Sequence, residues 1–596
     1  MSTAPYRDPS RPVEERVEDL LARMTLAEKA GQLFHTTLPM NSDGTLAEAS
    51  DEPSLRQGTT ELVTDGHLTH FHLVGRHGTR ATAEWVNRLQ ALAADTRLGI
   101  PVTLSTGPRH SFTDRAGAPF GAAAFSAWPD PLGLAAIGEP ELVEKFGDTV
   151  RREYLALGLR VALHPRMGLA TGPRRAGRSH RPNHRGSPAD VTSALFRAYV
   201  RGLQGPRLGP RSVAAVVTYC PADAQQNGGE PHFAHGGDRV HGGDRVRPGG
   251  THDHRIAPAR AVVETGCSQM MPHHGGRTRV DGSAEISFGL DRDALTGLPR
   301  ERHGFDGLVL DGLVLDGLVL DGLVHDGAVR TDPGLLTDAP ADGDPHRTRA
   351  WGVGPLTVAE RAAKALDAGA DQFGGEHGDQ CPETIVELVR SGRIPEERID
   401  ASVRRLLREK FVLGLFERRY VDPDRAEETV GAGEFTALGE AAQRRSLTVL
   451  TNRSLLPLTD RPNLYVEGVG AQTASLYGNV VADPAHADVA VLRLRTPYEE
   501  RLQETLALLA AVPTLVCVNL ERPTALPEIA AKAAALVADY GASDTALLDV
   551  AFGRARAEGR LPFELPRSLT TVGPSHQEAP ADTEPPLFPY GHGLTL

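Results

Sequence analysis

Cysteine is scarce in this sequence, with four among 596 residues, at Cys220, Cys267, Cys381 and Cys517. Their spacing fits neither a metal-binding motif nor a disulfide framework, which excludes a fold held together by either. Two further features are missing: a basic stretch followed by an apolar one at the start, and an apolar run long enough to cross a membrane. We therefore expect a cytoplasmic protein with no membrane partner.

An excess of positive charge is also missing. The 64 Lys and Arg residues are outnumbered by 77 Asp and Glu residues, which gives a formal net charge of −13. A surface of this sign does not attract nucleic acid or anionic lipid. Hydrophobic residues make up 40% of the chain, enough for full cores, and the length suits two large domains. We expect a small-molecule substrate and no nucleic-acid partner, and the sequence leaves open whether the chain forms a homo-oligomer.

Segments with the composition of strands alternate with amphipathic helices through the first half of the chain. The strands are expected at 67–74, 101–106, 159–165, 213–219 and 267–272. Helices are expected between them, for example at 84–96, 139–158 and 191–205. Strands and helices that alternate at this spacing are typical of a parallel α/β barrel.

The pattern changes after about residue 440. Strands are expected at 462–469, 488–495, 514–520 and 534–538, with helices at 502–511 and 545–552 between them. This alternation predicts a second α/β domain with helices on both faces of its sheet. We therefore assign 1–419 to a barrel domain, 420–440 to a linker, 441–570 to an αβα sandwich domain and 571–596 to a C-terminal tail.

The segment 305–338 contains a short tandem repeat, in which DGLV occurs four times and DGAV follows once. Repeats this short do not predict a solenoid, and we interpret them as a local insertion. Residues 328–331 have strand propensity, and Asp332 follows them directly before Pro-Gly. An Asp at the carboxyl end of a barrel strand faces the mouth of the barrel and could attack an anomeric carbon. An Asp in this context is also a common turn residue. The insert at 310–326 would lie at the rim of the mouth and narrow it.

Longer stretches of the sequence match a known family. They include VEDLLARMTLAEKAGQL near the start, QMMP at 269–272, LTVAERAAKALDAGADQFGG at 356–375 and GRLPFELPRS near the end. The chain resembles glycoside hydrolase family 3, in its bacterial exo-β-glucosidase-like branch, over nearly its whole length. The resemblance implies a TIM-like (β/α) barrel followed by an αβα sandwich, and the retaining hydrolysis of β-glycosides.

The resemblance also implies roles for single residues. Asp332 stands at the position of the family's nucleophile, and Glu499, in the text TPYE, is the candidate acid/base. Glu499 also fits the first turn of a helix, where the helix dipole stabilises an acid. His273, which replaces a tyrosine of the pocket, is a further acid/base candidate. The candidate substrate-binding residues are Thr106, Arg109, His110, His164, Arg174, Tyr219, Met271 and His274, and no cofactor or metal is expected.

Several positions depart from the family's pattern. Gly107, Gly168 and Gly172 stand where similar proteins have carboxylates, and Thr218 and Tyr219 stand where they have Lys and His. Such losses remove charge-assisted hydrogen bonds to sugar hydroxyls. Our first interpretation is therefore an enzyme with a rebuilt pocket, acting on a glycosylated or non-sugar small molecule with little ordinary β-glucosidase activity.

Two alternatives stay open. One is a genuine retaining β-glucosidase that uses Asp332 as its nucleophile, and the other is a non-catalytic binding or scaffold protein on the same fold. In every version the residues at the predicted strand ends should line a single cavity. These residues are Thr106, His164, Tyr219, His273 and Asp332.

Overall fold

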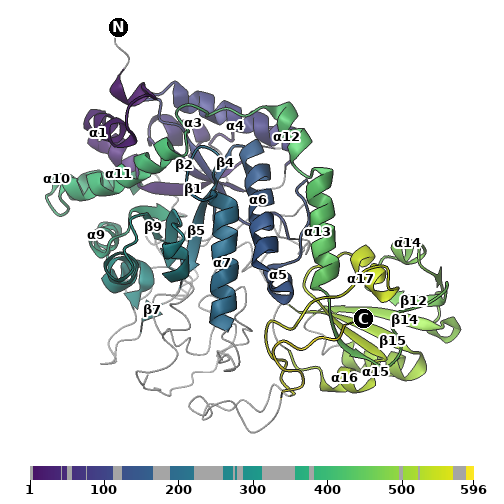
Figure 1. Ribbon diagram of the computed structural model, residues 1–596. Helices are drawn as coiled ribbons and strands as arrows, with labels where there is room; N and C mark the ends of the chain where they lie inside the picture. The colour runs from purple at the N-terminus through teal and green to yellow at the C-terminus, as the bar shows by residue number, and fades with distance from the viewer. Residues whose placement is uncertain are drawn as a thin grey trace.

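The protein consists of a closed barrel followed by a separate sheet, and the computed structural model in Figure 1 describes most of both. The described residues are 4–41, 43–49, 57–74, 77–111, 124–164, 188–219, 260–272, 276–277, 286–311, 356–374, 381–495, 501–520, 524–567 and 586–595. Within them, no helix combines the length and the apolar content that a membrane crossing requires.

Eight parallel strands form the barrel, in the order β1-β10-β9-β6-β5-β4-β3-β2. They are β1 (Phe34–Pro39), β2 (His70–Val74), β3 (Thr103–Thr106), β4 (Leu159–Ala162), β5 (Ala214–Tyr219), β6 (Gln269–Pro272), β9 (Leu308–Asp311) and β10 (Gln372–Gly374). Every strand has two neighbours, so the barrel has no free edge. Because all strands run the same way, their carboxyl ends meet at one mouth and their amino ends at one floor.

Helices surround the barrel, and their ends follow local signals. They are η1 (Pro5–Arg7), α1 (Val13–Arg23), α2 (Leu26–Gln32), α3 (Thr59–Thr64), α4 (Thr79–Ala94), α5 (Pro131–Ile137), α6 (Pro140–Ala156), α7 (Pro188–Gln204), η3 (Phe288–Leu290), η4 (Asp293–Arg302), α9 (Val358–Ala368), α10 (Cys381–Arg390) and α11 (Glu396–Val412). Thr25 and Thr357 each open a helix through a capping box. Gly369, with φ of 115°, ends α9 in a left-handed conformation that glycine adopts without strain. A small antiparallel pair, β7 (Gly276–Arg277) and β8 (Ile286–Ser287), lies between β6 and η3 in the sequence.

The second sheet has six strands in the order β11-β16-β15-β14-β12-β13. They are β11 (Thr448–Asn452), β12 (Asn463–Glu467), β13 (Asn479–Val480), β14 (Val489–Arg495), β15 (Thr514–Asn519) and β16 (Ala535–Asp539), with helices α14 (Ala471–Ala474), η6 (Pro484–His486), α15 (Leu502–Ala511), α16 (Pro527–Lys532) and α17 (Asp544–Ala551). Only β11 runs antiparallel to its neighbour. Separate apolar cores cover the two faces of the sheet, as in an αβα sandwich.

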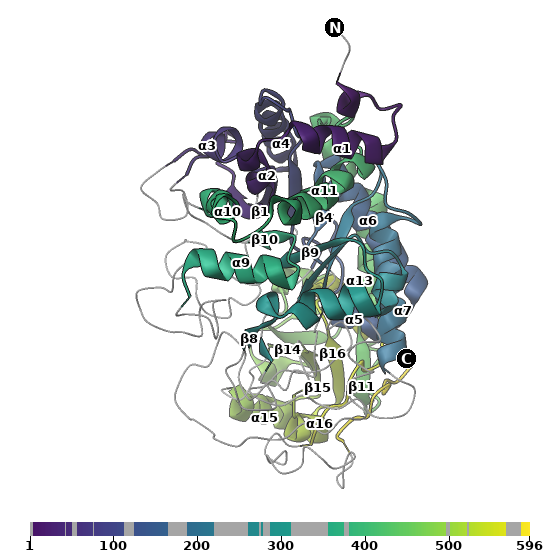
Figure 2. The same ribbon diagram turned by 90° about the vertical axis from the view of Figure 1, so that its left-hand side faces the viewer.

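Two helices, α12 (Pro423–Thr429) and α13 (Gly433–Ser446), connect the barrel to the sandwich. Figure 2 shows the sandwich below the barrel, on the far side from α1 and α11. The end of the chain returns to the sandwich, where Leu565 pairs with Phe588 and Val449 with Leu594.

The predicted fold class is confirmed, and the predicted strands of both domains overlap the observed ones. The predicted strand over 328–331 lies outside the described residues. Where the repeat begins, β9 pairs with β6 and β10. The domain boundaries stay predictions, and the predicted linker at 420–440 contains helix α12 and the start of α13.

The barrel interior is divided into a polar and an apolar half. The apolar half comes from β4, β5, β6 and β9 and includes Val161, Val216, Met271 and Leu310. The polar half comes from β1, β2, β3 and β10, and carries buried histidine, serine and glutamine side chains. The two halves meet around one lumen, because residues in register on neighbouring strands face the same side.

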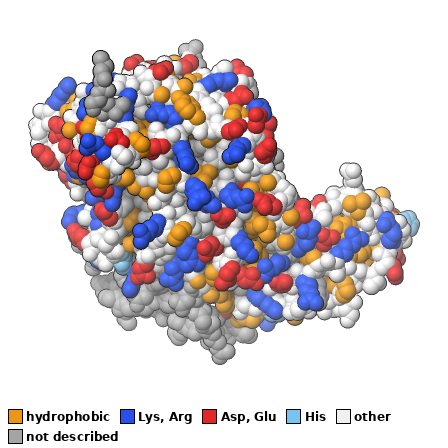
Figure 3. All heavy atoms as spheres, turned by 45° about the horizontal axis from the view of Figure 1, so that its top comes forward, with side chains coloured by type: hydrophobic (Ala, Val, Ile, Leu, Met, Phe, Trp, Pro, Cys, Tyr) orange, Lys and Arg blue, Asp and Glu red, His pale blue; other side chains and the backbone are white. Residues whose placement is uncertain are grey.

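Helix α11 closes the barrel floor with buried charged groups. Lys410 donates three hydrogen bonds, to the main-chain oxygens of Thr69 and Pro101 and to the Thr103 hydroxyl, at 2.7 to 3.0 Å. The three ammonium protons therefore each meet an acceptor. Figure 3 shows acidic and basic side chains interspersed over the exposed face of the helices beyond this floor, which fits ordinary solvated helix surfaces.

Candidate active site

Six of the predicted site residues lie within the described part of the chain: Thr106, Arg109, His110, His164, Tyr219 and Met271. The other five lie outside the described residues: Asp332, Glu499, His273, His274 and Arg174. The predicted lid from the repeat insert also lies outside them from residue 312 onward. The structure therefore describes the residues at the carboxyl ends of β2, β3, β4 and β5, which surround one side of the mouth.

Arg109 folds back over the carboxyl ends of β2 and β3. Its Nε donates to the Thr106 hydroxyl at 2.7 Å and its Nη2 donates to the main-chain oxygen of Leu73 at 3.1 Å. The side chain is 5% exposed. The structure thus brings Thr106 and Arg109 together at the mouth, and Thr106 acts as a support for the guanidinium.

His110 is paired with a carboxylate of the barrel wall. Its Nε2 lies 2.6 Å from Oε2 of Glu153 in α6, and both side chains are buried. The pKa of Glu153 is lowered although burial opposes this, because His110 and hydrogen-bond donors around the carboxylate favour its charged form. His110 therefore holds the segment after β3 in place, and any effect of this residue on substrate would be indirect.

His164 lies between two tyrosines. The Tyr199 hydroxyl donates to Nδ1 of His164 at 2.6 Å, and Tyr154 lies 3.4 Å from Nε2. The Tyr154 hydroxyl donates to the main-chain oxygen of Gly107 at 2.8 Å. Burial raises the pKa of both phenols, so both stay protonated and able to donate. This cluster holds the backbone at Gly107, the first residue beyond β3.

Tyr219 lies outside the lumen, contrary to the prediction. Its hydroxyl donates to the main-chain oxygen of Ala294 in η4, and its ring belongs to the core between the barrel and the helices. Neighbouring residues of a strand face opposite sides, so it is Thr218 that faces inward, in register with Met271 of β6. Thr106 and His164 also face the surrounding helices, and the expectation that they line one cavity with Tyr219 is wrong.

Thr218 and Met271 form the inner layer at the ends of β5 and β6. Met271 packs in the apolar half of the lumen, and the Thr218 hydroxyl is buried without a hydrogen-bond partner among the described residues. A buried hydroxyl without a partner costs free energy, so one at a barrel mouth is a candidate for contact with a ligand. The alternation along β5 was the signal in the sequence that could have singled out Thr218 over Tyr219.

A chain of hydrogen bonds crosses the polar half of the lumen, and the sequence analysis missed it. Nε2 of His35 lies 2.8 Å from the Ser105 hydroxyl, which lies 2.9 Å from Nδ1 of His72. Gln372 donates to the main-chain oxygen of Gln32, so its own oxygen faces Nδ1 of His35 at 3.3 Å. Nδ1 of His35 therefore donates to Gln372, and the Ser105 hydroxyl links Nε2 of His35 to Nδ1 of His72.

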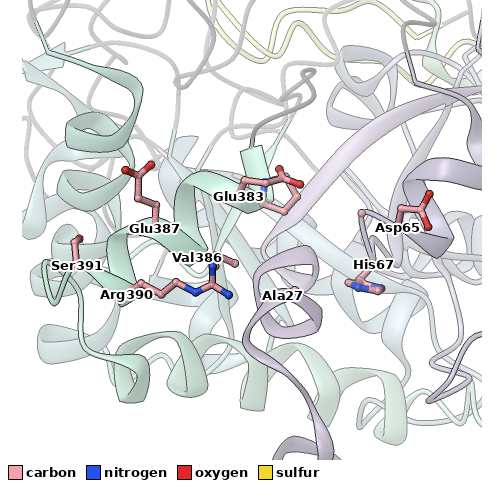
Figure 4. Close-up of a pocket in the computed structure, with 10 residues that line it drawn as sticks. Ala27, Asp65, His67, Glu383, Val386, Glu387, Arg390 and Ser391 are labelled. Atoms are coloured by element: carbon pink, nitrogen blue, oxygen red, sulfur yellow. The ribbon is translucent and has the colours of Figure 1, made fainter.

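A groove of about 560 Å³ lies elsewhere, between α2, the turn before β2 and α10. Figure 4 shows Glu383, Glu387 and Arg390 of α10 on one side and Asp65 and His67 on the other, with Ala27 of α2 between them. The turn precedes β2, so this groove lies toward the barrel floor. It contains none of the predicted site residues. Within the described ranges, no group of three His, Cys, Asp or Glu side chains has the arrangement of metal ligands.

Family models match both parts of the chain. Residues 25–332 match the glycosyl hydrolase family 3 N-terminal domain, and residues 478–596 match the glycosyl hydrolase family 3 C-terminal domain. A probable β-glucosidase C of Aspergillus flavus is 41% identical over 99% of this chain and 92% of its own length. A periplasmic β-glucosidase/β-xylosidase of Dickeya chrysanthemi is 36% identical over 99% of this chain and 91% of its own length.

Solved structures share the fold. A β-glucosidase from Erythrobacter marinus superposes with a TM-score of 0.72 at 20% identity, covering 100% of this chain and 84% of that one. A β-glucosidase from Listeria innocua in complex with glucose superposes with a TM-score of 0.67, also at 20% identity, covering 98% and 83%. With the barrel, the sandwich and matches that run through both, the chain belongs to glycosyl hydrolase family 3 and is a hydrolase.

Proposed function

We propose that this protein hydrolyses β-glucosides or closely related β-glycosides, with retention of configuration at the anomeric carbon. The observation that carries the proposal is 41% identity over 99% of the chain to a protein named as a probable β-glucosidase. The expected substrate is a small sugar-containing molecule, and the Listeria innocua relative in fold was solved with glucose.

The proposed reaction has two steps. The Asp332 carboxylate attacks the anomeric carbon, and the bond to the leaving oxygen breaks while Glu499 delivers a proton to that oxygen. Water then attacks the same carbon, Glu499 takes a proton from the water, and the Asp332 ester is released. Retention requires the two carboxyl groups to lie about 5 Å apart. Asp332 precedes the sandwich in the chain and Glu499 belongs to it, so both domains would contribute.

Described residues at the mouth would support this reaction. Arg109 and Thr218 lie at the mouth and would donate hydrogen bonds to sugar hydroxyls. The Tyr154 hydroxyl holds the carbonyl of Gly107, which keeps the start of the loop after β3 in one position. Buried, pre-oriented groups of this kind lose little entropy on binding.

The finer interpretation of a rebuilt pocket is a separate proposal. It rests on Gly107, Thr218 and the other departures from the family's sequence pattern. It predicts weak turnover of simple aryl β-glucosides. The relatives at 36–41% identity are named for glucoside or xyloside hydrolysis, which favours a conventional glycosidase over a non-sugar enzyme or a scaffold. Cytoplasmic location and homo-oligomer formation stay predictions.

Covalent labelling tests the proposed nucleophile. A 2-deoxy-2-fluoro-β-glucoside with a good leaving group should add one fluoroglucosyl group to the protein, and peptide mass mapping should place it on Asp332. Asp332→Asn should abolish the label and lower kcat/KM for an aryl β-glucoside by roughly 10⁴-fold or more. Asp342→Asn, in the same segment, is the matched control and should keep both. Equal turnover by Asp332→Asn and the unchanged protein would contradict the proposal.

A further inference from the structure

One buried carboxylate in the barrel wall binds three segments that are distant in sequence. Oε1 of Glu153 accepts from the main-chain nitrogens of Ser126 at 3.0 Å and Gly431 at 2.7 Å. Oε2 accepts from the Ser126 hydroxyl at 2.8 Å and pairs with Nε2 of His110 at 2.6 Å. The side chain is 0% exposed. We call the residues between β3 and α5 (107–130) the mouth segment, of which 107–111 and 124–130 are described. We call α12, α13 and the turn between them the connector. Glu153 thus joins the two described ends of the mouth segment to the connector.

Further hydrogen bonds join the two described ends of the mouth segment to each other. The main-chain nitrogen of Trp128 donates to the carbonyl of His110 at 2.7 Å, and Ser111 forms a bridge with Trp128. Nε1 of Trp128 donates to the Ser126 hydroxyl, the same hydroxyl that donates to Glu153. A shift of Glu153 would therefore move the start and the end of this segment together.

The connector and the sandwich rest on the same segment. Nε2 of Gln443, in α13, donates to the carbonyl of Ala127 at 2.9 Å, and the main-chain nitrogen of Asp130 donates to the carbonyl of Tyr540 at 2.8 Å. Gly431 has a φ of 70°, and a Cβ there would lie 2.4 Å from the carbonyl oxygen of Ala124. The chain thus needs glycine at the point where the connector meets the mouth segment and Glu153.

The charge of Glu153 matters for this arrangement. A carboxylate offers two acceptor oxygens, and here they face four groups that can donate: the main-chain nitrogens of Ser126 and Gly431, the Ser126 hydroxyl and Nε2 of His110. A glutamine would turn one oxygen into a donor, which faces the Ser126 hydroxyl and His110. Charge-assisted bonds are also stronger than neutral ones. An alanine would leave the main-chain nitrogens of Ser126 and Gly431 without their acceptor.

We propose that Glu153 is a positioning residue for glycoside hydrolysis. By holding the mouth segment and the connector on the barrel wall, it keeps the sandwich in the place where its proton donor meets the leaving oxygen at the barrel mouth. This inference rests on the proposed function, in which a residue of the sandwich protonates the leaving group. Glu153 touches no reacting atom and acts through His110, Ser126 and Gly431.

The dependence of the rate on the leaving group tests this role. A misplaced proton donor slows substrates with poor leaving groups, which need protonation, more than substrates with good ones, which leave without it. We expect Glu153→Gln and Glu153→Ala to hydrolyse 2,4-dinitrophenyl β-glucoside within about threefold of the unchanged protein. They should lose at least about tenfold more on phenyl or methyl β-glucoside.

Asp371→Asn is the matched control. Asp371 is also 0% exposed and also meets four donors, but all of them belong to the barrel floor. This variant should be destabilised while its rates change equally for all leaving groups. An equal loss for every leaving group in the Glu153 variants, as in Asp371→Asn, would overturn the inference and leave Glu153 with a role in stability alone.

Calorimetry separates a failure of this inference from a failure of the proposed function. If the unchanged protein hydrolyses no glycoside, the proposed function fails, and the coupling of the domains is still measurable. We expect Glu153→Ala to split unfolding into separate barrel and sandwich transitions, and Asp371→Asn to lower the unfolding temperature without such a split. A single lowered transition in Glu153→Ala would overturn the coupling.

Discussion

The barrel floor and the barrel wall each contain a fully buried carboxylate with four hydrogen-bond donors, Asp371 and Glu153. The partners of Asp371 are Val309, Arg300, Ser402 and Arg405, all from elements that close the floor. Glu153 instead joins a loop, a barrel helix and the connector to the sandwich.

The same chemistry thus serves stability at the barrel floor and, in our proposal, the placement of a second domain from the barrel wall. This division fits barrel enzymes in general, whose floors maintain the fold and whose mouths hold the site.

The largest effect on stability is expected at the floor. Asp371→Asn leaves Arg300 and Arg405 buried or half-buried without their full charge partner, which should lower the free energy of unfolding by about 3–5 kcal/mol. Chemical denaturation followed by circular dichroism measures the change. Asp367→Asn removes an exposed pair with Arg393 and should cost less than about 1 kcal/mol. Equal losses of unfolding free energy in the two variants would show that the buried Asp371 stabilises the fold no more than the exposed Asp367 does.

A pH titration should separate the polar half of the lumen from the mouth. Burial lowers the pKa of His35 to about 4 and lowers the pKa values of His70 and His72 as well. Between pH 6.5 and 4 the unfolded chain binds protons that the folded barrel refuses, so stability falls as the pH falls through this window. For His35 alone the loss reaches about 3 kcal/mol.

Denaturation midpoints measured from pH 7 to pH 4 check this slope. His35→Gln should flatten this dependence of the midpoint on pH. The pKa of Glu153 is lowered instead, so the stability from this carboxylate is present above about pH 4.5 and is lost only below it. If stability changed with pH only below pH 4.5, this would contradict our assignment of the pH dependence to the buried histidines.

The smallest effect is expected from a change at the mouth. No described atom lies within 4 Å of a Cβ placed on Gly107, so Gly107→Asp fits without strain. If the pocket lacks this acceptor, the new carboxylate should lower KM for an aryl β-glucoside about tenfold, the size of one charge-assisted hydrogen bond. Steady-state kinetics measure the change, and Gly433→Asp on the connector is the control. An unchanged or raised KM would indicate a pocket that is complete with Gly107 in place, and would contradict the rebuilt pocket.

Sequence reasoning succeeded for elements and failed for the orientation of single side chains. The strands at 214–219 and 269–272 follow from runs of β-forming residues, and the helix expected at 139–158 is observed as α6. Tyr219 was assigned to the mouth because it stands beside a strand end, yet strand alternation turns it toward η4. The alternation was visible in the sequence, but which set faces the lumen depends on pairing with β4 and β6.

What the sequence alone determined was the order of helices and strands and the change from barrel to sandwich, because these depend on composition and spacing over a few residues. What only the tertiary structure decided was which residues meet. The DGLV copies are equivalent by sequence, and the structure shows that Leu308–Asp311 pairs with β6 and β10. Glu153 and Gly431 are separated by 278 positions, and no local pattern marks their contact. Contacts of this kind form only when the whole chain has closed around them, since each depends on elements that local propensity cannot place.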